Sequence, residues 1–182
     1  MVKLQGELIY IATMERDDCR KIWNDFEYDF SQMTEPLQIG HSLTKADGWF
    51  DEIQKLQGNV HVRLGIFLPD GTVIGDIALQ DMDWKNRSCT IGCGLTKLEY
   101  RRKGYATDAA RTMIAYAFCH LGLERISSNT LEHNIGSRRV LEKCGFVLEG
   151  RERKSTYFAG KRYDKLLYGL LREEYISNGK QE

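Results

Sequence analysis

The pattern of hydrophobic and polar positions predicts an alternation of helices and strands along the whole chain. Apolar residues alternate strictly over 60–68 and 73–79, which predicts two strands joined by the turn Leu68-Pro69-Asp70-Gly71. Apolar residues at helical spacing predict a helix after Thr13, which can cap it, and another from about Thr44 to near Gly58. Further strands are predicted at 8–11, 88–96 and 124–130, further helices at 106–121 (ended by Gly122) and 135–144, and two closing strands that meet near 158–161.

These elements predict a mixed α+β fold, with about seven strands in a central twisted sheet and about four helices. The strand, helix, strand order between residues 88 and 130 implies a right-handed parallel crossover inside an otherwise antiparallel sheet. The chain has no internal repeat, low-complexity tract or Pro-rich linker, so we expect a single domain over residues 1–182.

Composition narrows the class of protein further. Twenty-six basic and 26 acidic side chains cancel, so the charge gives no reason to expect a nucleic-acid or membrane partner. Five cysteines, odd in number and without Cys-x-x-Cys spacing, indicate reduced thiols used for packing, and the four histidines lack metal-ligand spacing. The N-terminus carries no signal-like apolar run. We therefore expect a cytoplasmic protein without a metal site.

The segment Arg101-Arg102-Lys103-Gly104-Tyr105-Ala106 opens the longest predicted helix and carries the first candidate chemistry. A helix N-terminus offers unpaired backbone N–H groups and a positive dipole end to an anion. Gly104 permits close backbone approach, Ala106 keeps the first turn small, and three cationic side chains lie next to them. This combination suits a diphosphate, although a basic glycine-containing turn is by itself more often a solvated loop.

A second motif follows about thirty residues later and favours the diphosphate site over a solvated loop. The pattern Arg101-x-x-Gly104-x-Ala106, followed by Asn134-x-x-Ser137-x-x-Val140-x-x-Lys143-x-Gly145-Phe146, resembles the acyl-coenzyme A binding core of the GNAT superfamily of N-acyltransferases. The neighbouring residues look most like the ribosomal-protein N-terminal alanine acetyltransferase subfamily. The resemblance covers residues 88–150 and implies a GNAT-like fold and an acetyl-CoA-dependent N-acetyltransferase.

The resemblance also implies roles for individual residues in holding acetyl-CoA. Leu95 would pair with the pantetheine arm through its backbone, in a cleft between two parallel strands. The side chain of Asn134 would contact the same arm, although Asn is also a favoured helix N-cap and Ser137 stands at the matching third helical position. The remaining cofactor residues form the loop: Arg101 at a conserved family position, and the backbone amides of Arg102, Lys103, Gly104, Tyr105 and Ala106 around the pyrophosphate.

Two glycines in the strand before the loop have two readings of equal weight. Gly92 and Gly94 flank Cys93 inside the predicted strand. Glycines there mark either a bulge or close ligand approach, or weak packing at a tight crossing.

The implied reaction is direct attack of a neutral primary amine on the acetyl thioester, and it needs an acid and a base. The tyrosine that many family members use as the acid is replaced by Leu141, a core residue by its pattern. The ribosomal-protein subfamily uses a serine at the position of Ser137, so we expect Ser137 to be the acid.

The base has no such candidate, because threonines stand at two positions where related chains carry glutamate, Thr90 and Thr156. The nearby carboxylates could relay a proton through water, but each is more simply a turn or surface group. They are Asp76, Asp81, Asp83 and Glu132.

The missing glutamates bear on the acceptor, because a peptide α-amine has a pKa of about 7.7 to 8.0 and a lysine amine about 10.4. We therefore expect a protein N-terminal α-amine as the acceptor. Three alternatives stay open: a small amine such as a polyamine, amino acid or antibiotic, a non-catalytic acyl-CoA-binding module, and a protein-interaction domain on the same scaffold. A homodimer is also left open.

Overall fold

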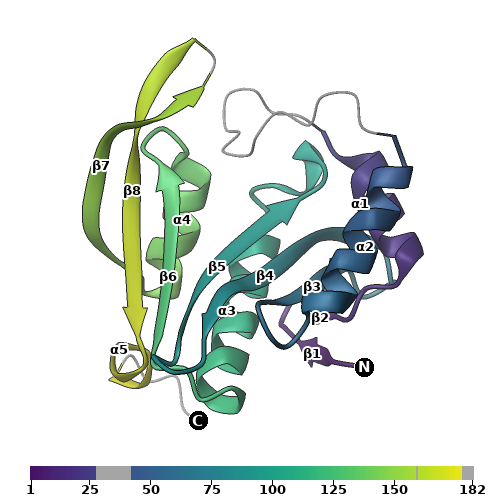
Figure 1. Cartoon of the computed structure of the whole chain (residues 1–182), viewed down its shortest axis with the longest axis horizontal. Helices are drawn as coiled ribbons and strands as arrows, with labels where there is room; N and C mark the ends of the chain where they lie inside the picture. The colour runs from purple at the N-terminus through teal and green to yellow at the C-terminus, as the bar shows by residue number, and fades with distance from the viewer. Residues whose placement is uncertain (28–41, 159, 178–182) are drawn as a thin grey trace.

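A computed structural model describes residues 1–27, 42–158 and 160–177, and eight strands of this part of the chain form one sheet in the order β1-β2-β3-β4-β5-β6-β8-β7 (Figure 1). The strands are β1 (Lys3–Gln5), β2 (Tyr10–Ala12), β3 (Val62–Phe67), β4 (Val73–Asp83), β5 (Ser88–Leu95), β6 (Arg125–Leu131), β7 (Val147–Phe158) and β8 (Lys161–Leu171). The helices are α1 (Arg16–Asp25), α2 (Thr44–Leu56), the short 3-10 turn η1 (Leu98–Tyr100), α3 (Tyr105–Ala115), the π-helical turn η2 (Tyr116–His120), α4 (Ile135–Cys144) and α5 (Arg172–Ser177). The predicted class is confirmed.

The parallel pair β5 and β6 is the feature of the sheet that positions the site. Their register runs only from Ser88 opposite Arg125 to Thr90 opposite Ser127, and beyond it β5 pairs with β4 alone. Figure 1 shows the two strands diverging from this closed end, with α3 as the crossover behind them. Every other neighbouring pair in the sheet is antiparallel, as predicted.

Helices cover both faces of the sheet and bury two separate sets of apolar side chains. The larger set joins α3 and α4 to the sheet and includes Ile77, Ile91 and Met113. The smaller set joins α1 and α2 to the other face and includes Cys19 and Ile53. Val73 of β4 belongs to the smaller set and Ile74, Ile77 and Leu79 to the larger, so the alternation of faces along β4 is interrupted at the register shift opposite Phe67.

One predicted helix cap was wrong. Thr13 does not cap α1, because its hydroxyl accepts a hydrogen bond from the amide of Val2, and a reciprocal capping box of Glu15 and Asp18 begins the helix instead. The predicted helix over 106–121 is confirmed, with its last turn, Tyr116–His120, in π-helical form, and Gly122 follows the C-cap Leu121 with φ 66°. Two short elements, β1 and α5, were not predicted and bring the sheet to eight strands.

The two N-terminal strands are tied to α3 by a single buried carboxylate. Asp108, in the first turn of α3, accepts hydrogen bonds from the amides of Glu7, Leu8 and Ile9 at 3.1, 2.7 and 3.1 Å. Hydrogen bonds to an ionised acceptor are stronger than neutral ones, so the β1–β2 connection is fixed beside the start of α3.

The cysteines are all free thiols, which agrees with the expected absence of disulfides. Cys19, Cys89 and Cys144 are buried, as expected of packing residues, whereas Cys93 and Cys119 are exposed and do not fit that role. Within the described ranges, no helix is both long and apolar enough to cross a bilayer.

Candidate active site

The free edge of β5 turns backbone amides toward the gap that opens between β5 and β6. The amide of Thr96 donates to the carbonyl of Ile74 at 2.9 Å, so this pair is hydrogen-bonded across β4 and β5. Hydrogen-bonded and non-hydrogen-bonded pairs alternate along an antiparallel ladder, which leaves the backbone groups of Cys93 and Leu95 pointing away from β4. The carbonyl of Ile91 already faces this way, since the hydroxyl of Ser128 on β6 donates to it at 3.0 Å.

The glycines of β5 keep this gap clear of side chains. A Cβ added at Gly92 would meet no atom within 4 Å, and one at Gly94 would meet only an oxygen of Asp76, at 3.9 Å. The tight-crossing reading is therefore wrong for both positions. The tight contact belongs to Gly75 on β4, where an added Cβ would lie 2.1 Å from the Gly94 carbonyl oxygen.

The first turn of α3 has the open backbone that the sequence predicted. Gly104 stands at the N-cap position with φ 91°, a left-handed conformation that favours glycine, and no side chain caps the helix. The acidic residue of this turn, Asp108, is engaged by the β1–β2 connection instead. The amides of Tyr105 and Ala106 are thus among those that an α-helix leaves without intrahelical partners. Arg102 and Lys103 are exposed beside them, which fits a diphosphate.

Asn134 and Ser137 lie across the gap from Leu95. Because β5 and β6 run parallel, the C-terminal ends of both strands reach the same open end of the gap, where Leu95 ends β5 and Asn134 follows β6. The side chain of Asn134 accepts a hydrogen bond from the Ser137 amide at 3.0 Å, so it is an N-cap of α4. Ser137 is half-buried, and its hydroxyl has no hydrogen bond to the described residues. Leu141 is buried, as expected of a core residue.

The four carboxylates that the sequence predicted to be turn or surface groups differ in their surroundings. Asp83 accepts from the amide and the side chain of Asn86, which lowers the pKa of its carboxyl, so it is a turn residue. Glu132 accepts from the amide of Asp164 and pairs with Arg151, linking β6 to the closing strands. Both fit the expected structural roles.

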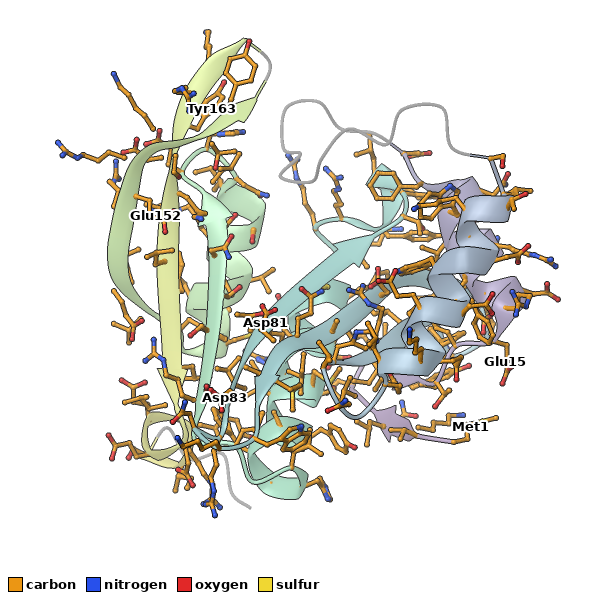
Figure 2. The ribbon with its side chains drawn as sticks, viewed as in Figure 1. Met1, Glu15, Asp81, Asp83, Glu152 and Tyr163 are labelled. Atoms are coloured by element: carbon orange, nitrogen blue, oxygen red, sulfur yellow. The ribbon has the colours of Figure 1, made fainter. Side chains whose placement is uncertain are left out.

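Asp81 is bonded to a residue of the neighbouring strand, because the hydroxyl of Thr90 on β5 donates to its carboxylate at 2.9 Å. Asp81 is exposed and adopts φ 50° in a register shift of β4. Figure 2 shows Asp81 and Asp83 toward the closed end of the sheet, away from Tyr163 near the tip of the closing hairpin.

Asp76 is not a surface group, and that expectation was wrong. Its carboxylate forms an ion pair with Arg63 on β3, and both side chains are less than a fifth exposed. Burial raises the pKa of the Asp76 carboxyl, and the Arg63 guanidinium offsets part of the rise. The sequence did hold a signal: Arg63 and Asp76 occupy the polar phase of two strands joined by one hairpin, so their side chains must share a face.

The residues described by the structure contain no cluster of histidine, cysteine and carboxylate side chains that could hold a metal ion. Oxygen, nitrogen and thiol ligands converge at known metal sites, and here they are spread over separate elements.

Comparisons with known proteins agree with this geometry. The family model described as "Acetyltransferase (GNAT) domain" matches residues 9–147, about three quarters of the chain. The chain therefore belongs to the GNAT family. It is an acetyl-CoA-dependent N-acetyltransferase.

Two Bacillus subtilis proteins are among its relatives. YdaF, described as "putative ribosomal N-acetyltransferase", is 39% identical over 108 residues, which span 59% of this chain and 58% of YdaF. The SPbeta prophage-derived uncharacterized N-acetyltransferase YokL is 34% identical over 174 residues, 95% of each chain. The structure of spermidine N-acetyltransferase from Vibrio cholerae, with CoA and spermine, superposes with a TM-score of 0.82 over 94% of this chain and 99% of that one. At 21% identity, this likeness concerns the fold alone.

Introducing an acidic side chain into the first turn of α3 should weaken diphosphate binding without destabilising the helix. A glutamate there interacts favourably with the helix dipole, but it repels an anion at the same amides. We expect Ala106→Glu to keep its melting temperature and to bind CoA roughly ten- to hundredfold more weakly, as like charges a few ångströms apart require. Calorimetric titration with CoA measures this.

Thr44→Glu is the matched control, because it places the same charge in the first turn of α2, on the opposite face of the sheet. Unchanged CoA affinity in Ala106→Glu, or an equal loss in Thr44→Glu, would contradict diphosphate binding at α3.

Proposed function

We propose that this enzyme acetylates the α-amine of a protein N-terminus, in the manner of the ribosomal-protein N-terminal acetyltransferases that its motifs resemble. The relative YdaF supports this choice through its description as a "putative ribosomal N-acetyltransferase". The observation that carries it is Thr90, which stands where related chains place a glutamate base and is bonded to Asp81. An acceptor that loses its proton easily suits a site without that glutamate.

The energetics favour an α-amine over a lysine side chain. Their ordinary pKa values differ by about 2.4 to 2.7 units, which is a difference of roughly 3.5 kcal/mol in the free energy of deprotonation. A lysine or polyamine acceptor needs that additional free energy from a strong base. An α-amine near neutral pH is already partly neutral, so positioning supplies more of the rate.

In this proposal, acetyl-CoA binds to the start of α3, to the free edge of β5 and to Asn134 at the start of α4. The amides from Arg102 to Ala106 hold the diphosphate at the start of α3, with Arg101 beside them. The pantetheine arm extends the free edge of β5 by pairing with Leu95, while Asn134 faces it across the gap. This arrangement leaves the acetyl carbonyl at the amides that β5 turns away from β4, which suits stabilisation of an oxyanion.

Ser137 completes the reaction as the acid in this proposal. The amine nitrogen attacks the carbonyl carbon, the carbon–sulfur bond breaks, and the sulfur keeps its electron pair. The Ser137 hydroxyl, which bonds to no described residue, is available to give the thiolate its proton and to recover one from solvent.

The acceptor class is tested by thiol release with three kinds of amine at equal concentration and pH. We expect peptides that begin with Ala or Ser to be acetylated more efficiently than acetyl-capped, lysine-containing peptides or spermidine. Free CoA is measured with a thiol reagent, and the acetylated position by mass spectrometry. A higher kcat/KM for lysine peptides or spermidine would reject the α-amine proposal.

Ser137→Ala removes the proposed acid without disturbing the cap of α4, because the cap uses the Ser137 amide. We expect kcat to fall by roughly a hundredfold or more, within the usual range for an acid, while the KM for acetyl-CoA stays nearly constant. Ser177→Ala on α5 is the control, since its hydroxyl bonds only within that helix. A kcat within a factor of two of the parent would remove Ser137 from the mechanism.

A further inference from the structure

We propose that Asp76, held by Arg63, accepts the proton of the acceptor ammonium and is the base of this enzyme. The inference rests on the proposed function, since it concerns how the amine is made nucleophilic. Neither Asp76 nor Arg63 belongs to the two motifs that bind acetyl-CoA. The sheet nevertheless brings Asp76 next to Gly94 of β5, the strand whose other edge borders the gap.

The two oxygens of Asp76 point toward different neighbours. Oδ2 is bonded to the guanidinium of Arg63 on β3. Oδ1 accepts no hydrogen bond from the described residues, and it lies 3.9 Å from the place that a Cβ of Gly94 would occupy. Asp76 is opposite Gly94 in the register of β4 and β5. The absent side chain at Gly94 therefore leaves Oδ1 uncovered beside the residues of β5 whose amides face the gap.

The face of the sheet on which Asp76 lies also agrees with its role as a base. In the proposed binding mode the diphosphate lies at the start of α3, on the face of the sheet that α3 and α4 cover. The acyl group would then reach the gap from that side. A nucleophile that attacks the carbonyl must then come from the opposite face. Asp76 lies on the face covered by α1 and α2, where Arg63 stacks over the ring of Trp49 at 5.6 Å. The side chains of Arg63 and Asp76 remain 19% and 18% exposed.

Distance decides between Asp76 and the other candidate carboxylate, Asp81. The partner of Asp81 is Thr90, the last residue of β5 that still pairs with β6, at the closed end of the gap. Thr90 is four residues from Gly94, which is about 13 Å along an extended strand. Asp76 is directly across the ladder from Gly94, at a Cα separation of roughly 5.5 Å for a hydrogen-bonded pair.

The surroundings of Asp76 make its carboxylate more basic than an exposed one. Burial raises the pKa of its carboxyl, and Arg63 limits the rise. The other titratable groups that interact with it are the thiols of Cys19 on α1 and Cys93 on β5. Burial raises the pKa of the Cys19 thiol to about 12, so that thiol stays neutral and the charge balance at Asp76 is set by Arg63.

The proposed step conserves atoms and charge. An N–H bond of the ammonium breaks, and its proton passes to Oδ1 of Asp76, directly or through one water. The nitrogen lone pair then forms the bond to the acetyl carbon, the carbon–sulfur bond breaks, and a second N–H bond breaks as the amide forms. That second proton passes to solvent and balances the proton that the thiolate takes through Ser137. Asp76 afterwards releases the proton to solvent, so each turnover yields one proton, one amide and one molecule of CoA.

Asp76→Asn tests the proposal through a pH profile of kcat/KM with the α-amine peptide that the parent enzyme uses best. We expect a loss of roughly 10² to 10⁴-fold near pH 7, the usual effect of a positioned base. The deficit should shrink as the pH passes the acceptor pKa of about 8, because the amine then loses its proton unaided. Asp81→Asn, a matched change on the same strand, should keep the parent profile.

Arg63→Met supplies a readout that a purely structural pair would not produce. Removing the guanidinium raises the pKa of the Asp76 carboxyl further, because Arg63 lowers it in the parent. The acid limb of the profile should therefore move to higher pH. If Asp76→Asn does not fold, the double variant Arg63→Met with Asp76→Asn removes both charges, and it should fold without regaining activity.

Several outcomes would overturn the proposal. These are an unchanged pH profile of kcat/KM in Asp76→Asn, parent activity in a folded double variant, and an acid limb that does not move in Arg63→Met. Loss of activity in Asp81→Asn in place of Asp76→Asn would also overturn it. Each differs from failure of the proposed function, in which the parent enzyme itself would release no CoA with any α-amine. Binding of CoA by Asp76→Asn should equal that of the parent, which confirms that the acetyl-CoA side is intact.

Discussion

The structure depends on one constraint: β5 and β6 pair for three residues and then separate. A parallel strand pair normally continues its ladder, and here the ladder ends at Thr90 opposite Ser127. The consequence is a free strand edge inside a sheet, with backbone groups of Cys93 and Leu95 that no neighbouring strand satisfies. A substrate that carries amide groups along an extended arm is the natural partner for such an edge, and pantetheine is of that kind.

The separation also brings three kinds of chemistry to one place. The parallel direction of β5 and β6 puts their C-terminal ends at the same open end, so the first turn of α3 and the Asn134 cap of α4 lie on either side of the gap. Antiparallel β4 lies on the other edge of β5 and places Asp76 opposite Gly94. A proposed binding loop, a proposed acid and a proposed base thus come from elements far apart in the sequence.

The sequence predicted most of the fold because its periodicity is strong, as in the alternation of Val62, Leu64 and Ile66 and in the apolar face of α3. Two local motifs sufficed to predict the acetyl-CoA side, since that chemistry uses backbone amides at a helix start. Asp76 was interpreted as a turn or surface carboxylate because alternation on β4 places it on the polar phase, which usually faces water. Here α1 and α2 cover that phase, and only tertiary structure shows that its carboxylate is buried beside the gap. The short elements β1 and α5 lacked enough residues to show a period.

The most direct test of the account is the response of the backbone amides to CoA. In a nitrogen-15 NMR titration of the labelled enzyme, the amides of Cys93, Leu95, Tyr105 and Ala106 should show the largest shifts, because they form the strand edge and the helix start. Saturation with the main changes confined to other elements, such as α5 and β7, would show that the separated strands do not hold the substrate.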